Sequence, residues 1–399
     1  MGNILIQIAS YRDPDLSNTI NDLLDKKSGE NDIVISVVDQ SDELINSKYI
    51  HNYEFVPYKQ TEGVCWARAK LQKTYKNEDF TLMLDSHHRF APNWDTLLIN
   101  EWEDLYNDGE DPLITTYLPS FDPDNGQLTP EPWQLNFDRF TPEGVVFTLP
   151  AVIPDWQSLG HPVPTQFFSA HFAFVEGEFC KKVPYDPNYY FHGEEINMAV
   201  RAFTHGYDLY SPHELIAWHE YTRINRTKHW DDDPTWSERN RKSLERNLEF
   251  FGIDNTERTI DFGDYDFGDK RTLIDYETYA GIRFKDRAVK EDTINHMYPP
   301  IEQNGRWTSC QRHCINVPAG KIHGQHDFCV VAFKDGAGHD IYREDAGREE
   351  IKQLISDGGD GIINIWRTFD CAEQAKRCVV WPHHEDNGWD TEMSFDLGL

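Results

Sequence analysis

Short runs that are apolar on both faces alternate with helical patterns in the first part of the chain. The predicted buried strands are residues 3–10, 33–39, 53–58, 80–90 and 113–118. The segments between them that carry helical spacing are residues 16–24, 64–75 and 93–106. Continuous Ile, Val and Leu runs separated by helices are typical of parallel strands covered on both faces. The pattern therefore predicts an α/β fold around a mostly parallel sheet.

The later part of the chain changes character twice. Residues 119–166 are rich in Pro, Gly and aromatic residues and have little periodicity, which predicts a long functional loop. Beyond it, strands are expected at 167–179 and 215–221, and helices at 193–208 and 235–253. Past about residue 300, short strands bounded by Gly and Asp indicate a small β-rich domain. The predicted domains are residues 1–255, a polar connector at 256–299 and a C-terminal domain at 300–399.

Charge and cysteine content narrow the function classes. The formal net charge is −31, from 69 acidic and 38 basic residues, so the surface repels nucleic acid and anionic membranes. The seven cysteines are too scattered for a disulfide framework, and no basic leader or long apolar segment is present. These features favour a cytoplasmic protein that neither binds nucleic acid nor spans a membrane. The many aromatic rings suit a protein core and also the stacking of sugars.

Polar residues gather where the predicted strands end, which is where ligands bind in open α/β sheets. Asp85 and His87 stand two residues apart just past a buried strand, so both side chains can reach one divalent cation. His219 lies on the later predicted strand at 215–221 and is expected to complete the site. His88 adjoins His87, and the sequence leaves open which of the two imidazoles binds. A cation held by so few ligands keeps positions open for diphosphate oxygens.

Six segments, in the same order, resemble the polypeptide N-acetylglucosaminyltransferase family, which includes hydroxyproline GlcNAc-transferases. They are residues 6–20, 63–75, 80–95, 191–212, 216–223 and 271–287. The resemblance covers roughly residues 3–290 and implies a GT-A fold, a UDP-sugar donor, most simply UDP-GlcNAc, and retention of anomeric configuration. The Asp85-Ser86-His87 and Gly193-Glu194-Glu195 segments are also similar to mucin-type polypeptide GalNAc-transferases.

The resemblance also implies roles for individual residues. Asp85 and His87 match the family's DxH motif, and His219 matches the later histidine that completes a Mn²⁺ or Mg²⁺ site. Glu194 and Glu195 match an acidic pair that faces sugar hydroxyls or the acceptor. The residues assigned to the sugar nucleotide are Ser10, Tyr11, Arg12, Asp39, Arg68 and Ser86.

Two further segments carry candidate chemistry. Residues 222–234 are basic and then acidic and are interpreted as a lid, in which Arg223, Arg226, Lys228 or His229 closes over the diphosphate. In the tail, Cys310, Cys314, His323 and His326 fit the spacing of no common zinc finger, so no structural zinc is expected among them. His171, His192 and His205 are interpreted as structural.

The resulting hypothesis is a retaining, metal-dependent glycosyltransferase that acts on a hydroxyl group, with a protein as the expected acceptor. Three alternatives stay open. The acceptor could be a glycan, a lipid-linked sugar or a modified nucleobase. The scaffold could instead serve a non-catalytic sugar-nucleotide or carbohydrate-binding protein, since fold alone does not fix function. The same Asp and His residues could also serve a metal-dependent hydrolase.

Overall fold

The computed structural model describes residues 2–45, 48–222, 226–358 and 361–397, which form two compact units. The larger unit comprises Met1–Arg139, Glu143–Ile282 and Asp292–Gln303. The smaller unit comprises Phe140–Pro142, Arg283–Glu291 and Asn304–Leu399. The chain therefore passes between the two units more than once.

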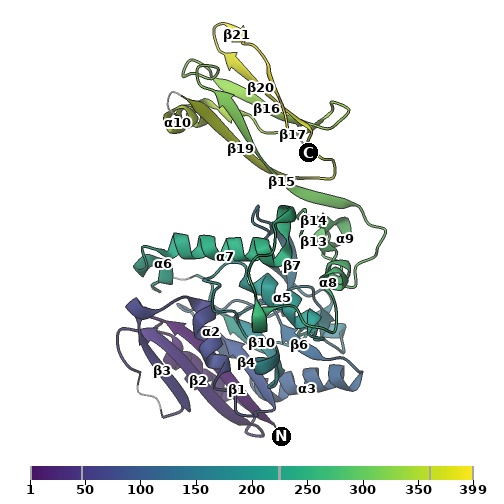
Figure 1. The fold of residues 1–399 in the computed structure, drawn as a ribbon. Coiled ribbons are helices and arrows are strands. Elements are labelled where there is room, and N and C mark those ends of the chain that lie inside the picture. The colour runs from purple at the N-terminus through teal and green to yellow at the C-terminus, as the bar shows by residue number, and fades with distance from the viewer. Residues whose placement is uncertain (1, 46–47, 223–225, 359–360, 398–399) are drawn as a thin grey trace. The chain divides into compact units, whose positions relative to one another are not determined.

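A mixed eight-stranded sheet forms the centre of the larger unit (Figure 1), with strand order β3-β2-β1-β4-β10-β6-β11-β9. The strands are β1 (Asn3–Tyr11), β2 (Asp32–Ser41), β3 (Asn52–Pro57), β4 (Phe80–Leu84), β6 (Pro112–Thr115), β9 (Val163–Pro164), β10 (Phe172–Glu176) and β11 (Asp208–Ser211). Strands β1 to β4 pair in parallel, whereas β10 is antiparallel to both β4 and β6. The predicted α/β fold is confirmed, and the sheet predicted to be mostly parallel also contains the antiparallel strands β10 and β9.

Helices of the larger unit pack against this sheet or against one another. They are α1 (Leu16–Lys26), α2 (Val64–Gln72), α3 (Trp94–Asn107), α4 (Phe179–Lys182), α5 (Glu194–Thr204), α6 (His229–Asp232), α7 (Trp236–Phe251) and α8 (Leu273–Ala280). Ile4, Ile6 and Ile8 of β1 share one buried cluster with Leu16 and Ile20 of α1. Burial of alternate β1 residues against one apolar helix stripe explains why the two periodicities in the sequence predicted these elements.

The predicted strand at 80–90 proved to be two strands. β4 ends at Leu84, and β5 (His88–Phe90) leaves the main sheet to pair with β12 (Ala217–His219). Asp85, Ser86 and His87 form the turn between them, and His219 lies directly opposite His88 in the β5–β12 register. A continuous apolar run does not record a change of pairing partner, so the sequence could not show this break.

Two stretches contain more regular structure than their composition indicated. The predicted loop at 119–166 includes the hairpin β7 (Trp133–Phe140) and β8 (Val146–Val152). The polar stretch at 254–299 contains α8, β13 (Ile282–Arg283), β14 (Ala288–Lys290) and α9 (Glu291–Ile294). In α8, Tyr276 is fully buried and its hydroxyl donates to the Gln166 carbonyl at 2.6 Å. A few buried rings therefore hold a segment whose average composition is polar.

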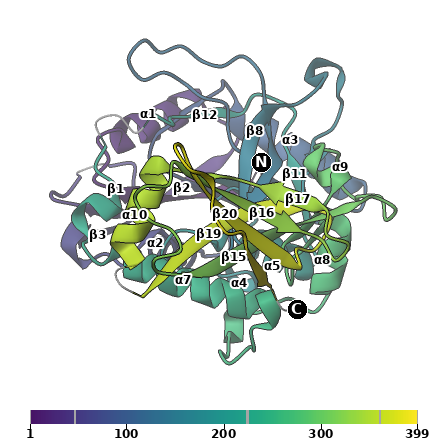
Figure 2. The same ribbon diagram turned by 90° about the horizontal axis from the view of Figure 1, so that it is seen from above.

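The smaller unit is built from antiparallel strands, which confirms the predicted β-rich C-terminal region. The long strands β15 (Trp307–Pro318) and β19 (Ile362–Cys371) pair along their whole length, and β16 (Phe328–Lys334) pairs with β20 (Arg377–His384). The shorter strands are β17 (Asp340–Arg343), β18 (Ala346–Gly347), β21 (Gly388–Trp389) and β22 (Met393–Asp396). Helix α10 (Arg348–Gly358) is seen in Figure 2 beside the strands of the smaller unit. Its Ile351 belongs to the buried core of that unit.

None of the helices in the described ranges is long and apolar enough to cross a lipid bilayer.

Gly63, which precedes α2, occupies a position that only glycine tolerates. Its φ of +117° lies in the left-handed half of backbone space, and a Cβ there would stand 2.8 Å from the Tyr190 carbonyl oxygen. We predict that Gly63→Ala lowers the free energy of unfolding by about 2–3 kcal/mol, because strain and overpacking add. Gly29→Ala is the matched control, since its φ is +89° with no atom within 4 Å of the Cβ position. Equal losses in urea unfolding of the two variants would contradict the steric account.

Candidate active site

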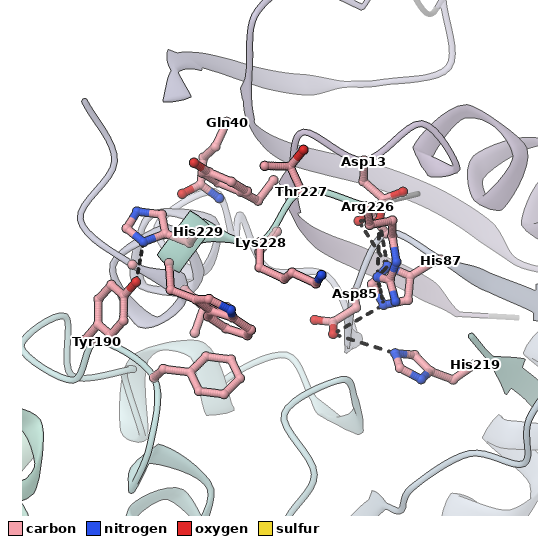
Figure 3. A pocket seen from close by; sticks show the side chains of 17 residues that line it. Asp13, Gln40, Asp85, His87, Tyr190, His219, Arg226, Thr227, Lys228 and His229 are labelled. Atoms are coloured by element: carbon pink, nitrogen blue, oxygen red, sulfur yellow. Dashed lines mark hydrogen bonds and ion pairs between the residues drawn. The ribbon is translucent and has the colours of Figure 1, made fainter. Parts of the chain in front are cut away.

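Asp85, His87 and His219 converge at the carboxyl end of β4 (Figure 3). Asp85 Oδ2 lies 3.8 Å from Nε2 of His87 and 3.8 Å from Nε2 of His219. One potential ligand atom from each residue lies within 4.8 Å of the other two. This spacing suits three ligands of one cation. His87 lies in the turn before β5 and His219 ends β12, and the β5–β12 pairing brings the two imidazoles together.

Asp13 orients the His87 ring. Its Oδ2 lies 2.7 Å from His87 Nδ1 and accepts a hydrogen bond of 2.7 Å from the Ser86 hydroxyl. A carboxylate on one ring nitrogen orients the other, Nε2, toward Asp85 Oδ2, as in many carboxylate–histidine–metal arrangements. Asp13 follows β1 by two residues, so the strand-end rule that drew attention to Asp85 could have found it too.

His219 supplies the test of whether a metal fits. Both of its ring nitrogens are buried and neither has a hydrogen-bond partner within the described residues. Burial holds the pKa of His219 well below its usual range, so the ring is neutral and has a lone pair to donate. A buried unpartnered imidazole beside a carboxylate is unfavourable unless a ligand completes it. The residues present therefore fit a divalent cation.

His88, the other candidate imidazole, lies behind the site. Its Nδ1 is 3.0 Å from the Asp85 carbonyl oxygen, and the ring is fully buried against His219 and His171. It is not part of the ligand cluster, so the geometry favours His87 as the ligand. His171 is also buried, with its nitrogens on Ser169 Oγ and the Leu118 N–H.

Arg68 joins the candidate metal ligand to the acidic pair. Its guanidinium is 4% exposed and donates to Asp85 Oδ1 at 3.1 Å and to Glu194 Oε1 at 3.3 Å. Burial alone would raise the pKa of Asp85, but the facing His219 and the Arg68 charge hold it well below its usual range. Asp85 is therefore a carboxylate. Arg68 thus lies on the Glu194 side of the ligand cluster, where its buried guanidinium forms an ion pair with Asp85.

Glu194 and Glu195 occupy the first turn of α5 in different environments. Glu195 accepts the Ala170 N–H at 2.9 Å and the Tyr117 hydroxyl at 3.0 Å. Glu194 has Arg68 as its partner. Burial, and then the charge of Glu195, raise the pKa of Glu194 to about 8. At neutral pH the Glu194 carboxyl thus carries a proton, so it can both donate and accept hydrogen bonds.

Two cavities meet at the ligand cluster. One is lined by residues that follow the parallel strands and by the segment 226–230, with Tyr11, Gln40, Gly63 and Tyr190 among them. The other is lined by Glu194 and Glu195 together with an aromatic and histidine wall: Tyr117, Phe147, His171, His192 and Tyr221. Asp85, Phe191 and His219 line both. A bound cation would therefore stand between a strand-end cavity and an acidic cavity.

Of the residues predicted to hold the nucleotide, some line the strand-end cavity and others do not. Tyr11 and Ser86 line the strand-end cavity. Arg12 is held away by Asp232 and Asp42, at 2.8 and 2.9 Å. Asp39 is 1% exposed and accepts the Tyr53 hydroxyl at 2.6 Å.

Ser10 is likewise buried, and Gln40, which lies opposite Tyr11 on β2, lines the cavity in place of Asp39. Successive strand residues face opposite sides, so an offset of one residue exchanges the exposed side chain for a buried one. Gln40 Nε2 also donates to the Ser10 carbonyl at 3.0 Å. Asp39 is thus a partner of Tyr53, and Gln40 is the polar side chain that a ligand would meet.

The predicted lid contributes Arg226, Lys228 and His229 to the strand-end cavity, whereas Arg223 lies outside the described residues. Arg226 Nη2 pairs with Glu220 at 2.7 Å, and Nη1 lies 2.7 Å from Nε2 of His87. His229 Nδ1 is 2.5 Å from the Tyr190 hydroxyl (Figure 3). The sequence reasoning missed Tyr190, Phe191 and Trp230, aromatic residues of this cavity with no local signal to separate them from core rings.

Comparison with solved structures identifies the fold. GalNAc-T7 with UDP, GalNAc and Mn²⁺ superposes with a TM-score of 0.52 and 13% identity, over 100% of this chain and 73% of that chain. The S. aureus protein TarS 1-349 in complex with UDP-GlcNAc gives a TM-score of 0.38 and 11% identity, over 64% of this chain and 68% of that chain. The first match confirms the predicted GT-A architecture, and the second is too distant to support a conclusion.

Of the two sequence comparisons, one found a match and the other did not. No curated protein sequence matches this chain. A family model described as Glycosyltransferase (GlcNAc) matches residues 42–286, more than half of the 399-residue chain, including the whole ligand cluster. The chain therefore belongs to the GlcNAc glycosyltransferase family.

Proposed function

We propose that this chain is a retaining, metal-dependent glycosyltransferase that moves N-acetylglucosamine from UDP-GlcNAc to a hydroxyl group of a protein. The observation that carries the proposal is the position of Asp85, His87 and His219 between the strand-end cavity and the acidic cavity. A UDP-sugar has the same layout, with a nucleoside on one side of its diphosphate and a sugar on the other. The donor type agrees with the family and with the UDP in the GalNAc-T7 structure.

The proposed cofactor is Mn²⁺ or Mg²⁺. Asp85, His87 and His219 would hold it, and Asp13 would keep His87 in register. When bound, the ion supplies Lewis-acid stabilisation of the negative charge that grows on the leaving diphosphate. Two imidazoles beside one carboxylate favour Mn²⁺ over Mg²⁺, which prefers oxygen ligands.

The strand-end cavity would bind the uridine diphosphate. Tyr11 and Gln40 line it at the ends of β1 and β2, with the rings of Tyr190 and Trp230 nearby. Arg226 and Lys228 bring positive charge to the same cavity, suited to the diphosphate. Closure of this segment over the donor would exclude water from the reacting bond.

The acidic cavity would bind the transferred sugar and the acceptor hydroxyl. Glu195 is held by Ala170 and Tyr117, and Glu194 carries a proton at neutral pH, so both would position hydroxyl groups. Retention requires the acceptor to approach the face that the diphosphate leaves. The departing phosphate oxygen then lies next to the acceptor and takes its proton, so no side-chain base is required.

The proposed catalytic domain is residues 1–255, with 256–299 as connector and 300–399 as the β-rich domain. Parts of the connector, such as Tyr276, are buried within the larger unit and would move with the catalytic domain.

Asp85→Asn should lower kcat/KM for UDP-GlcNAc hydrolysis and transfer by about 100–1000-fold, because it removes charge from the ligand cluster and from the Arg68 ion pair. EDTA should lower the rate of the wild-type protein by a similar factor. Added Mn²⁺ should then restore the rate of the wild-type protein but not that of Asp85→Asn. Asp25→Asn, an exposed change on α1, is the matched control and should leave the rate unchanged. Full turnover in EDTA would exclude the metal-dependent mechanism, and donor hydrolysis that no acceptor accelerates would favour a hydrolase.

Glu194→Gln tests the protonation of the buried acid. Its folded-state pKa of about 8 lies above the usual 4.5, so wild-type stability falls as pH rises between these values. Glutamine cannot ionise, so the Tm of the variant should match wild type at pH 5 and rise relative to it toward pH 9. Glu238→Gln on the exposed face of α7 serves as control and should show no such trend. A Tm difference that is flat across this range would mean that Glu194 is ionised throughout.

A further inference from the structure

A second group of metal-ligating side chains lies in the smaller unit and shares no residue with the candidate active site. His323, His326, His384 and Asp390 each place one potential ligand atom within 4.8 Å of the others. The ring centroid of His326 lies 3.9 Å from that of His323 and 4.2 Å from that of His384. From this cluster we propose that the C-terminal unit binds one zinc ion through three imidazoles and one carboxylate.

The four side chains come from two loops that separate strands bring together. His323 and His326 lie in the turn between β15 and β16, where the His326 N–H donates to the His323 carbonyl at 3.0 Å. His384 ends β20, and Asp390 follows β21, the hairpin partner of β20 at the top of Figure 1. The Asp327 N–H donates to the His383 carbonyl at 3.0 Å and so holds the first loop against β20.

His326 is the strongest sign that a ligand belongs here. Its side chain is 0% exposed, and its Nε2 has no hydrogen-bond partner within the described residues. The nearest acceptor, Asp390 Oδ2, is 3.5 Å away, too far for a well-formed hydrogen bond.

Asp390 is fixed so that one oxygen faces the imidazoles. Its N–H donates to the Pro382 carbonyl at 3.0 Å, and its own carbonyl accepts the Trp381 Nε1–H at 2.8 Å. Oδ1 accepts the Thr391 N–H at 2.7 Å, which leaves Oδ2 for the cluster, 4.0 Å from His384 Nε2. Anchoring of this kind around a first ligand is typical of metal sites.

The donor set selects the ion. Three imidazoles and one carboxylate give four ligands, the number that zinc takes in a closed tetrahedral site, and hard cations such as Mg²⁺ and Ca²⁺ prefer all-oxygen sites. Cys310 and Cys314 lie on β15 and are not part of the cluster. This zinc site therefore differs from a site made of those two cysteines with His323 and His326, which the sequence spacing did not support. His384 and Asp390, far along the chain, replace the cysteines.

Binding through His326 Nε2 has one structural consequence. The His323 N–H donates to His326 Nδ1 at 3.0 Å, and ligation through Nε2 leaves the ring proton on Nδ1. Because Nδ1 then carries the proton, metal binding requires a change of tautomer and breaks the hydrogen bond from the His323 N–H. The ion would cross-link the two loops and restrict the unfolded chain across a long segment, so zinc should stabilise this unit.

The test is the zinc content of the intact, untagged chain after loading with Zn²⁺ and gel filtration, measured by plasma mass spectrometry. His384→Gln and Asp390→Asn should each retain about one zinc per chain fewer than wild type, because each removes one of the four ligands. Asp85→Asn should keep this equivalent, because it changes only the candidate catalytic site. His339→Gln is the matched control, an exposed histidine of the same unit that pairs with Asp335.

Thermal unfolding gives an independent readout. Zinc should raise the Tm of wild type and His339→Gln and should leave the Tm of His384→Gln and Asp390→Asn unchanged. Asp390 is 43% exposed at its side chain, so Asp390→Asn reports on zinc even if His384→Gln fails to fold. Equal zinc content in wild type and Asp390→Asn, or a Tm that ignores zinc in every variant, would overturn the proposal and mark the cluster as a histidine–aspartate hydrogen-bond network.

Discussion

The buried guanidinium of Arg68 is the interaction on which the candidate site depends. It lies between Asp85, at the end of β4, and Glu194, at the start of α5, and it is within 3.3 Å of both. Without the positive charge of Arg68, the acidic side chains of Asp85, Glu194 and Glu195 would lie together in a low-dielectric space. Breaking such a buried pair typically costs about 3–5 kcal/mol, because one charge stays uncompensated. The position of Arg68 depends in turn on α2, whose start at Gly63 packs directly on Tyr190.

The sheet supplies the second condition. β4 stops at Leu84, and the chain then turns through Asp85 into β5, which pairs with β12 instead of the main sheet. That change of partner carries His219 to within 3.8 Å of Asp85. The same turn separates the two cavities, so the division between a strand-end side and an acidic side follows from the backbone path. The fold thus explains why these ligands line both cavities.

Much of this arrangement can be predicted from local patterns. Buried strands and amphipathic helices repeat at periods that a single sequence shows, and Asp85, His87, His219 and Glu194 stand next to their ends. The resemblance to a transferase family added the order of these segments. What could not be predicted depends on tertiary contacts. Gln40 faces the cavity in place of Asp39 because of a one-residue change of face.

Other contacts also lie beyond the reach of a local pattern. Asp13 stands just past a strand end, but its contact with His87 follows only from the pairing of β1 with β4. Tyr190 resembles any core tyrosine until the fold brings it beside His229. In the smaller unit, His326 meets His384 and Asp390 only after β16 and β20 pair. Clusters of this kind are set by strand pairing between distant segments, and no spacing in the sequence records it.

The central claim is that a cation at Asp85, His87 and His219 links the protein to the diphosphate of its donor. Calorimetric titration with UDP and with uridine, each with Mn²⁺ and with EDTA, tests it most directly. The account predicts that Mn²⁺ tightens UDP binding at least about tenfold and leaves uridine binding unchanged, because only the diphosphate reaches the ion. Equal UDP affinity in Mn²⁺ and EDTA, or an equal gain for uridine, would contradict it.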